Sequence, residues 1–353
     1  MNRHRVLASL LGLVIASVFC QAQSFVLDLP RSSQHALISQ RVGITDITIN
    51  YHRPLVNGRK IWGSLVPYGQ VWRAGANENT TITFSDPVTI EGKPLDKGTY
   101  GLHMIPGESQ WTVIFSKNST SWGSFTYNQA EDALRVSVNP QATDLHEALT
   151  YDFGQVKPDS AVVTLAWEKV AVPFTVGVNT KEIVAENLHK QLRGLAQYSW
   201  DGWNDAANYL LDGNVHLDEA LQYEDKSIQN EERFENLLTK SRVLDALGRK
   251  EDATATRDKA LAKATPLQLH FYARQLQGQK KQEEAFAIFR SNYKKHPSEW
   301  FVHTGMARIY SAQGDFDNAA KEMRTALATA PDQQRSYVDG LVKRLEAKED
   351  INK

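Results

Sequence analysis

Residues 306–331 read MARIYSAQGDFDNAAKEMRTALATAP. Apolar residues recur at every third or fourth position on either side of Gly314, which is the spacing of one buried helix face. Gly314 marks a turn, and Pro331 ends the second helix because proline lacks the amide hydrogen that a helix interior needs. The stretch therefore predicts two antiparallel helices in close contact through the small side chains of Ala307 and Ala319.

The same pattern occurs once more directly upstream. Ala285 and Ala319 are 34 residues apart, and Pro297 and Pro331 have the same separation. A period of this length, with small residues at the helix crossing and proline at the end, resembles the tetratricopeptide repeat. The resemblance implies stacked helix pairs that form an all-α superhelix with a concave face.

Working outward from these two units gives the organisation of the helical half. A weaker copy spans residues 234–266, and a degenerate copy begins near Trp203. We expect four tetratricopeptide-like repeats over residues 199–331, preceded by a bridging helix over 181–198. Residues 332–353 are rich in charged side chains, which predicts a polar capping helix and a tail.

Residues 25–178 show a different periodicity. Ile47, Ile49 and Tyr51 alternate with polar residues, and similar short alternating runs continue to Trp167. Alternation with period two is typical of strands that bury one face, and Gly- and Pro-containing turns separate the runs. The pattern predicts an antiparallel β-sandwich or jelly roll, so the chain is expected to hold an all-β domain followed by an all-α domain.

Three motifs in the β half point to a family. They are YHRP at 51–54, GRKIWG at 58–63 and LVPYGQVWRAGANE at 65–78. These motifs resemble the signature of an exported bacterial family that is defined only as a domain of unknown function, DUF2911. The resemblance covers about residues 25–178 and implies exported members, often with helical repeats appended, but no activity.

The first 22 residues have the layout of an export signal. A basic start precedes an apolar run over 6–19, and small residues follow at a cleavage site. We therefore expect residues 1–22 to be removed and the protein to be periplasmic or extracellular. Lipid attachment at Cys20 is the alternative, but Phe19 stands where a lipoprotein signal needs a small residue.

The composition limits the function classes. Hydrophobic residues make up 41% of the 353 residues and charged residues 23%, which is typical of a globular protein. The formal net charge of −1 provides no broad basic field for nucleic acid. The apolar run of the export signal is too short to span a membrane, and no later stretch approaches the necessary length, so no transmembrane segment is expected.

The segment 52–78 concentrates arginine, tryptophan and glycine. In a pocket, arginine binds a carboxylate or phosphate, while tryptophan stacks on a sugar or an aromatic ring. The candidate ligand-binding residues are Arg53, Arg59, Trp72, Arg73, Asn77 and Glu78. The alternative is structural: tryptophan side chains fill the sandwich, and arginine side chains donate hydrogen bonds to loop carbonyls.

Metal binding and catalysis find less support. His52, Glu78 and His103 are weak candidates for a two-histidine, one-carboxylate metal site, because no close spacing accompanies them. The sequence has no Gly-x-Ser-x-Gly motif and no phosphate-binding glycine loop. We therefore assign no catalytic residue and expect no cofactor, although missing motifs do not exclude an enzyme.

The repeats offer a candidate partner-binding surface. Arg242, Arg274 and Arg308 lie at equivalent positions of the last three repeats, on the first helix of each pair. An arginine column on the concave face would bind an acidic peptide segment. The alternative is that these residues are solvated helix formers, with Asp245 one turn from Arg242 as an ion-pair partner.

Together these features predict an exported binding or scaffolding protein. The repeats would bind a protein partner through an acidic segment that lies in the groove. The β domain would hold a small polar or glycan ligand. The alternative is a cell-envelope hydrolase or lyase with its site in the 52–78 loops.

Overall fold

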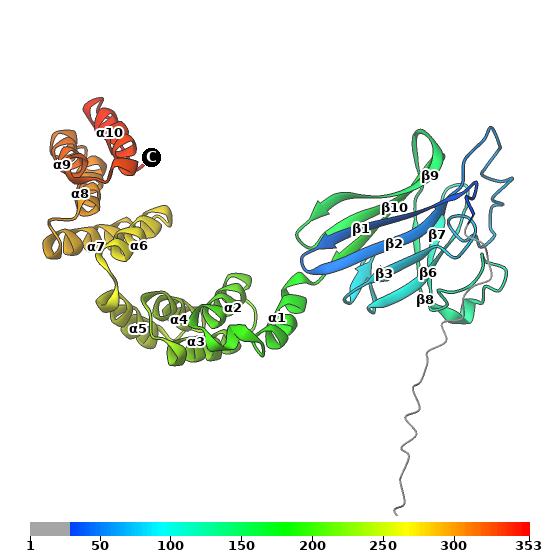
Figure 1. Cartoon of the computed structure of the whole chain (residues 1–353), viewed down its shortest axis with the longest axis horizontal. Helices are drawn as coiled ribbons and strands as arrows, with labels where there is room; N and C mark the ends of the chain where they lie inside the picture. The colour runs from blue at the N-terminus through cyan, green and yellow to red at the C-terminus, as the bar shows by residue number, and fades with distance from the viewer. Residues whose placement is uncertain (1–28) are drawn as a thin grey trace, which may run out of the picture. The chain divides into compact units, whose positions relative to one another are not determined.

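The computed structural model describes residues 29–353 of the chain (Figure 1). The expected export signal at 1–22, including Cys20, lies outside the described residues. The chain divides into two compact units between Val178 and Asn179. Within residues 29–353, no helix is both long and apolar enough to cross a membrane.

The first unit contains two sheets in which every strand pair is antiparallel. One sheet has the order β1 (Gln34–Val42), β2 (Thr45–Arg53), β3 (Thr81–Phe84), β6 (Gly98–Ile105), β7 (Trp111–Ser116) and β8 (Asp132–Val138). The other has the order β5 (Lys93–Leu95), β4 (Val88–Ile90), β10 (Ser160–Val178) and β9 (Gln141–Lys157). The short alternating strands that the sequence predicts are present, β1 is an additional strand, and β9 and β10 form a long hairpin.

Aromatic side chains from both sheets meet in the core. The ring centroids of Tyr51 on β2 and Tyr151 on β9 are 4.8 Å apart, and those of Phe115 on β7 and Phe174 on β10 are 5.9 Å apart. All four side chains are at most 2% exposed. The sheets therefore pack face to face through a common core, as expected of a sandwich.

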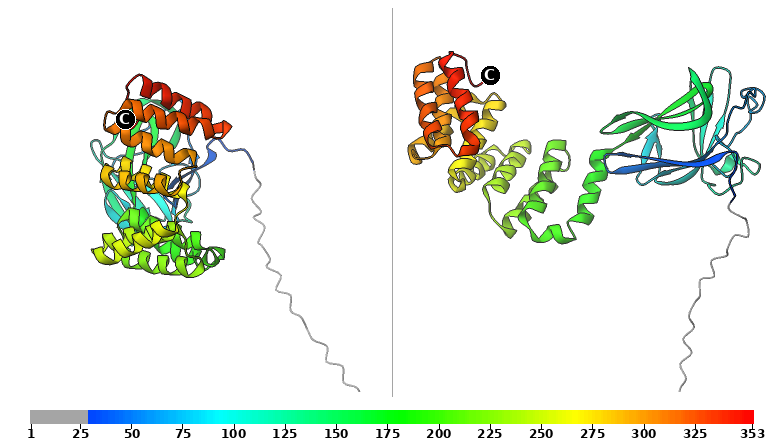
Figure 2. Two further views of the ribbon diagram at one scale, coloured as in Figure 1. Left: turned by 90° about the vertical axis from the view of Figure 1, so that its left-hand side faces the viewer. Right: turned by 45° about the horizontal axis from the view of Figure 1, so that its top comes forward.

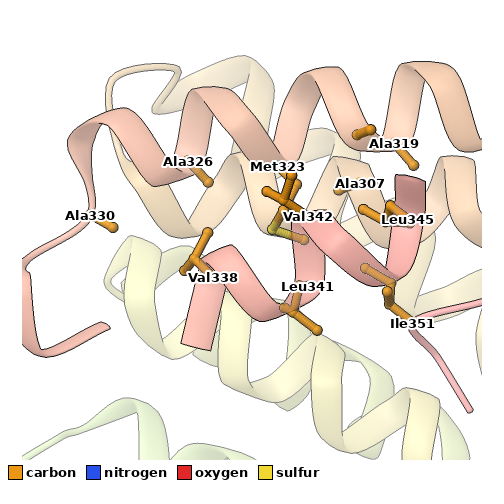
Figure 3. Packing of buried hydrophobic residues seen from close by; sticks show 11 residues of the cluster. Ala307, Ala319, Met323, Ala326, Ala330, Val338, Leu341, Val342, Leu345 and Ile351 are labelled. Carbon is orange, nitrogen blue, oxygen red and sulfur yellow. The ribbon is translucent and has the colours of Figure 1, made fainter. Parts of the chain in front are cut away.

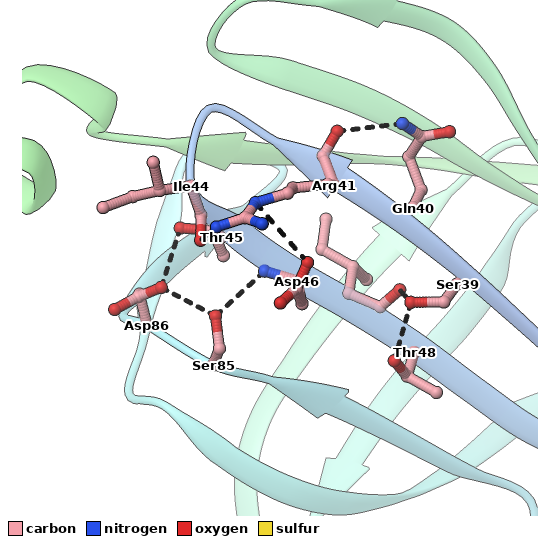
Figure 4. Close-up of polar contacts among 10 residues, drawn as sticks. Ser39, Gln40, Arg41, Ile44, Thr45, Asp46, Thr48, Ser85 and Asp86 are labelled. Atoms are coloured by element: carbon pink, nitrogen blue, oxygen red, sulfur yellow. Dashed lines mark hydrogen bonds and ion pairs between the residues drawn. The ribbon is translucent and has the colours of Figure 1, made fainter.

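Polar side chains tie the β1–β2 hairpin to the end of β3 (Figure 4). Thr45, which is fully buried, donates to Asp86 over 3.0 Å, and the same carboxylate oxygen accepts from Ser85 over 2.7 Å. The backbone amide of Asp46 donates to the Ser85 hydroxyl over 2.9 Å. This network satisfies polar groups at the start of β2 and the end of β3 and ties these two strands together.

A tryptophan cluster fills the region beside the long β2–β3 connection. Trp62 contacts Trp72, Trp111 and Trp167 edge-on at centroid distances of 5.7, 4.8 and 5.7 Å. Trp72 stacks on Trp167 at 5.9 Å with an interplanar angle of 18°. Trp62, Trp111 and Trp167 are buried, whereas Trp72 is half-buried. The cluster joins the connection to strands β7 and β10.

The second unit is made of helices. It begins with α1 (Thr180–Gln191) and a short 3-10 helix, η2 (Leu195–Tyr198), where the sequence predicts a bridging helix. Antiparallel pairs follow (Figure 2): α2 (Trp200–Gly213) with α3 (Leu217–Asn230), α4 (Phe234–Ala246) with α5 (Lys250–Lys263), α6 (Pro266–Gly278) with α7 (Gln282–Lys295), and α8 (Trp300–Ala312) with α9 (Phe316–Thr329). The predicted order, an antiparallel β half and then a tetratricopeptide-type helical half, is confirmed.

Small residues allow the close contact within each pair. Ala273 and Ala285, and likewise Ala307 and Ala319, are fully buried. In the second pair Ser241 takes the equivalent place, and its hydroxyl donates to a backbone carbonyl of α5 over 2.8 Å. The repeat spacing in the sequence therefore corresponds to the helix crossings in the structure.

The last helix, α10 (Asp332–Glu346), packs on α9 (Figure 3). Its apolar face contributes Val338, Leu341, Val342 and Leu345 to a cluster with α8 and α9. The chain then turns back, and Ile351 enters the same cluster with 4% exposure. The predicted cap is thus polar on one side only, and the tail is part of the core.

Gly305 shows how tightly the repeats stack. A Cβ atom at this position would lie 2.6 Å from the ring of Phe289, which is 1% exposed and cannot move away easily. We expect Gly305→Ala to lower the free energy of unfolding by about 1–3 kcal/mol, despite the better helix propensity of alanine.

Gly340 provides the matched control, because a Cβ atom there meets no other atom within 4 Å. Gly340→Ala should raise the free energy of unfolding by about 0.4–1 kcal/mol. Urea denaturation followed by helical circular dichroism measures both changes. Equal effects of the two substitutions would contradict the packing described for Gly305.

Candidate functional site

The arginine side chains of the 52–78 segment bind the protein's own backbone. Arg53 donates to the Leu149 carbonyl and the Thr150 hydroxyl over 2.9 and 2.8 Å. Arg59 donates to the Val56 carbonyl over 3.1 Å and to the Leu55 carbonyl over 2.5 Å. These contacts agree with the structural alternative, in which arginine side chains hold a loop that lacks regular strand pairing.

Three predicted ligand residues nevertheless line one hollow. Arg59, Trp72 and Arg73 border a cavity of about 320 Å³ beside the tryptophan cluster. Arg73 donates to the Asn77 carbonyl over 2.6 Å and lies 5.7 Å from the ring centre of the exposed Phe125. The hollow combines cationic and aromatic side chains, but its arginines already have protein acceptors.

Asn77 and Glu78 contact the residues just before β1. The Asn77 amide donates to the Ser33 carbonyl over 3.1 Å, and Glu78 forms an ion pair with Arg31 at 2.5 Å. His52 Nε2 lies 3.2 Å from the other Glu78 oxygen. Burial opposes ionisation of Glu78, but the hydrogen bond from Arg31 and the nearby charges leave its pKa below the usual value.

His103 does not join His52 and Glu78. Its Nδ1 lies 2.9 Å from the Ser124 hydroxyl, and its ring contacts Tyr127. Burial lowers the pKa of His103 to about 4, so the ring is neutral at pH 7. The imidazole that does lie beside His52 belongs to His35, its cross-strand neighbour on β1, at a centroid distance of 5.4 Å. Among residues 29–353, no three His, Cys, Asp or Glu side chains are arranged to hold a metal ion.

The three arginines of the repeats have different surroundings. Arg242 is exposed and forms an ion pair with Asp212 at 2.9 Å, so the expected partner Asp245 is wrong. Arg274 donates to Gln277 over 3.0 Å. Arg308 is only 3% exposed. The expected uniform, open column is therefore wrong, because the chain's tail and α10 cover its last member.

The contacts of Arg308 explain its burial. One terminal nitrogen donates to the Ile351 carbonyl over 2.8 Å, and the other donates to the Tyr337 hydroxyl over 3.2 Å. Burial lowers the pKa of Arg308 to about 10, and the positive charge of Arg274 acts in the same direction. The guanidinium therefore stays charged at neutral pH in a poorly solvated place.

Arg274 and Arg308 line a groove of about 460 Å³ formed by α6, α8 and α10. Several large apolar side chains of this groove are solvent-accessible: Phe271 is 63% exposed, Tyr337 55% and Leu267 43%. The full lining is Leu267, His270, Phe271, Arg274, Trp300, Phe301, Thr304, Arg308, Pro331, Gln333, Gln334, Tyr337 and Leu341. It holds two arginines and no aspartate or glutamate.

The apolar part of this groove is not predicted from the sequence. Leu267 and Phe271 stand four residues apart on α6, with Arg274 one turn further. The only sequence pattern that indicates this surface is an i, i+4 pair of large apolar residues beside an arginine. It is ambiguous, since the same spacing marks a buried helix face.

The comparisons with known proteins agree with this division of the chain. Residues 33–176 match the sequence model of a family described as protein of unknown function (DUF2911). A search of curated proteins gives no match.

Two solved structures are similar to part of this chain at low identity and low TM-score. One is a chain of the APC/C hetero-tetramer Cut9-Hcn1, with 15% identity and a TM-score of 0.29 over 48% of this chain and 33% of that chain. The other is YrrB, a TPR protein with an unusual peptide-binding site, with 15% identity and a TM-score of 0.26 over 46% of this chain and 86% of that chain. The present chain spans about a third of the first structure's length. Residues 33–176 thus match the DUF2911 family model, in agreement with the resemblance of the motifs at 51–78, and antiparallel helix pairs follow this segment.

Proposed function

We propose that this protein is an exported, periplasmic scaffold whose helical repeats bind a segment of a protein partner in the groove of α6, α8 and α10. The observation that carries the proposal is the groove lining: exposed Phe271 and Tyr337 lie beside Arg274 and Arg308, without an acidic residue among the described lining. Such a surface favours an apolar and acidic segment. The periplasmic location rests on the export signal read from residues 1–22.

The β domain has a second, smaller part in the proposal. Its hollow beside Arg59, Trp72 and Arg73 is large enough for a small polar or glycan ligand, at about 320 Å³. Because the arginines already donate to backbone carbonyls, a ligand would add to existing contacts. The repeat groove is therefore the main binding surface.

The groove is tested by Phe271→Ala. The side chain is 63% exposed, so its loss should leave stability within about 0.5 kcal/mol of wild type. Loss of a central aromatic contact should weaken partner binding at least about tenfold. The measurement is crosslinking and pull-down from an envelope extract, followed by titration of the partner that wild type captures.

Phe125→Ala is the matched control, because Phe125 is 81% exposed but belongs to the β domain. It should capture the same partner as wild type. If Phe271→Ala also retains the partner unchanged, the groove is not the binding surface and the proposal fails.

A further inference from the structure

Two buried nitrogen atoms of the groove have no hydrogen-bond partner among the described residues. They are Nε of Arg308 and Nδ1 of His270, in side chains that are 3% and 8% exposed. Both side chains line the groove between α6, α8 and α10. An unpaired buried polar atom is costly, so a site with two of them is incomplete without an acceptor.

The charges around these atoms select an anion. Arg308 carries its charge at neutral pH, and Arg274 adds a second positive charge nearby. Burial, together with these two arginines, lowers the pKa of His270 to about 4, so its ring is neutral at pH 7, and the tautomer with the proton on Nδ1 donates from that atom. A carboxylate accepts from both groups and offsets the repulsion between the arginines.

The apolar surface beside these nitrogens indicates what accompanies the carboxylate. Phe271 and Tyr337 expose large parts of their rings along the same groove. His270 itself is packed against Phe289 and Phe301, at centroid distances of 5.5 and 5.8 Å, which holds its ring in place. The site therefore suits an acidic side chain next to a large apolar one.

The chain's own tail binds α8 in a similar way. The Asp350 carboxylate accepts from Ser311 over 2.9 Å, and the adjacent Ile351 side chain is buried. The Ile351 carbonyl accepts from Arg308 over 2.8 Å. The α8 residues Ser311 and Arg308 thus already hold an acidic–apolar pair of the chain itself, and Arg308 also lines the groove.

Building on the proposed function, we infer that the groove recognises an internal Asp or Glu side chain adjacent to an aromatic or branched apolar residue, with His270 and Arg308 as donors to the carboxylate. The acid is a side chain of the partner segment and not its chain terminus. This assignment follows the example of Asp350 and Ile351 on the neighbouring turn.

The test uses short Gly/Ser peptides, acetylated and amidated, with a central Glu-Phe or Gln-Phe pair. Fluorescence anisotropy with the purified chain should show Glu-Phe binding at least about tenfold more tightly than Gln-Phe, because hydrogen bonds to a charged acceptor are the stronger kind. His270→Phe keeps the ring packing and should reduce this ratio severalfold, with an unchanged circular dichroism spectrum. Arg308 is not substituted in this test, because its side chain also donates to the Ile351 carbonyl and so holds the end of the chain on α8.

The outcomes separate this inference from the proposed function. Equal binding of both peptides, or an unchanged ratio in His270→Phe, would overturn the carboxylate assignment. If Phe271→Ala still abolished binding of the peptides in that case, the groove would remain the binding surface. Tighter binding of a Gln-Phe peptide with a free carboxy terminus would overturn the choice of an internal side chain. Absence of binding by every peptide would reject the inference, while the partner capture described above would decide the proposed function on its own.

Discussion

We expect Trp167→Ala to lower the free energy of unfolding of the β domain by about 3–5 kcal/mol, the usual cost of removing a large buried aromatic side chain. Trp167 is 1% exposed on β10 and contacts both Trp62 and Trp72. Its loss removes packing from a sheet strand and from the long β2–β3 connection together. The cavity cannot close easily, because Trp62 packs against Trp111 and the backbone of Trp72 is hydrogen-bonded to that of Met104.

Trp122→Ala is the matched control for this prediction. Trp122 belongs to the same domain but is 54% exposed, so its removal should change stability by about 0.5 kcal/mol or less. Calorimetry of the full chain measures both variants, and hydrogen exchange of β9 and β10 peptides assigns the change to the β domain. Similar losses in the two variants would mean that the tryptophan cluster does not stabilise the domain as described.

The second large effect concerns Glu224 on α3. The residue is fully buried, and its two carboxyl oxygens have no hydrogen-bond partner among residues 29–353. Burial raises the pKa of Glu224 to about 9, opposed by Lys240 and assisted by Asp225 and Asp205. The folded protein therefore keeps a proton that the unfolded chain has lost at neutral pH.

The sign of the pH dependence follows from this difference. The folded pKa of about 9 lies above the ordinary value of 4.5, so the folded state binds more protons between these limits. Stability of the helical unit consequently falls as pH rises from about 4.5 to 9, by up to roughly 1.4 kcal/mol per pH unit. Glu224→Gln, which is neutral at every pH, should remove this slope and raise the free energy of unfolding at pH 7 by about 1–3 kcal/mol.

Urea denaturation at several pH values, followed by helical circular dichroism, measures the slope. Glu186→Gln is the control, because Glu186 is an exposed glutamate in the middle of α1. It should leave the slope of wild type intact. A wild-type stability that is flat between pH 5 and 8, or a Glu224→Gln variant that keeps the slope, would show that Glu224 is paired or solvated.

Repetitive and alternating patterns are the parts of the fold that the sequence predicts best. Ala273, Ala285, Ala307 and Ala319 mark helix crossings because only small residues fit there, and the same 34-residue period sets the helix bounds. In the β half the alternation of Ile47, Ile49 and Tyr51 corresponds to a buried strand face. Such patterns need only local information about which face is buried.

The candidate sites depend on contacts between distant segments, which local patterns do not contain. Arg242 and Arg308 occupy equivalent positions, yet one is exposed and the other is buried, because Ile351 folds back onto α8. The histidine beside His52 is His35 and not His103, because the β1–β2 register places it there. The alternating pattern of the sequence does not predict β1 as a strand, so the pairing of His35 with His52 could not be expected from it.

The return of the tail onto α8 has a consequence for how such an array changes during evolution. Solenoid proteins gain length when a repeat is duplicated, and a new unit needs an open face on which to stack. Here α10 and Ile351 occupy the apolar surface that follows α9. A duplicated unit therefore enters more easily between existing helix pairs than after α10, where it would have to displace Ile351 and break the bond from Arg308. Variation in repeat number among homologous chains is accordingly expected upstream of residue 332, with the final pair and its cap inherited as one block.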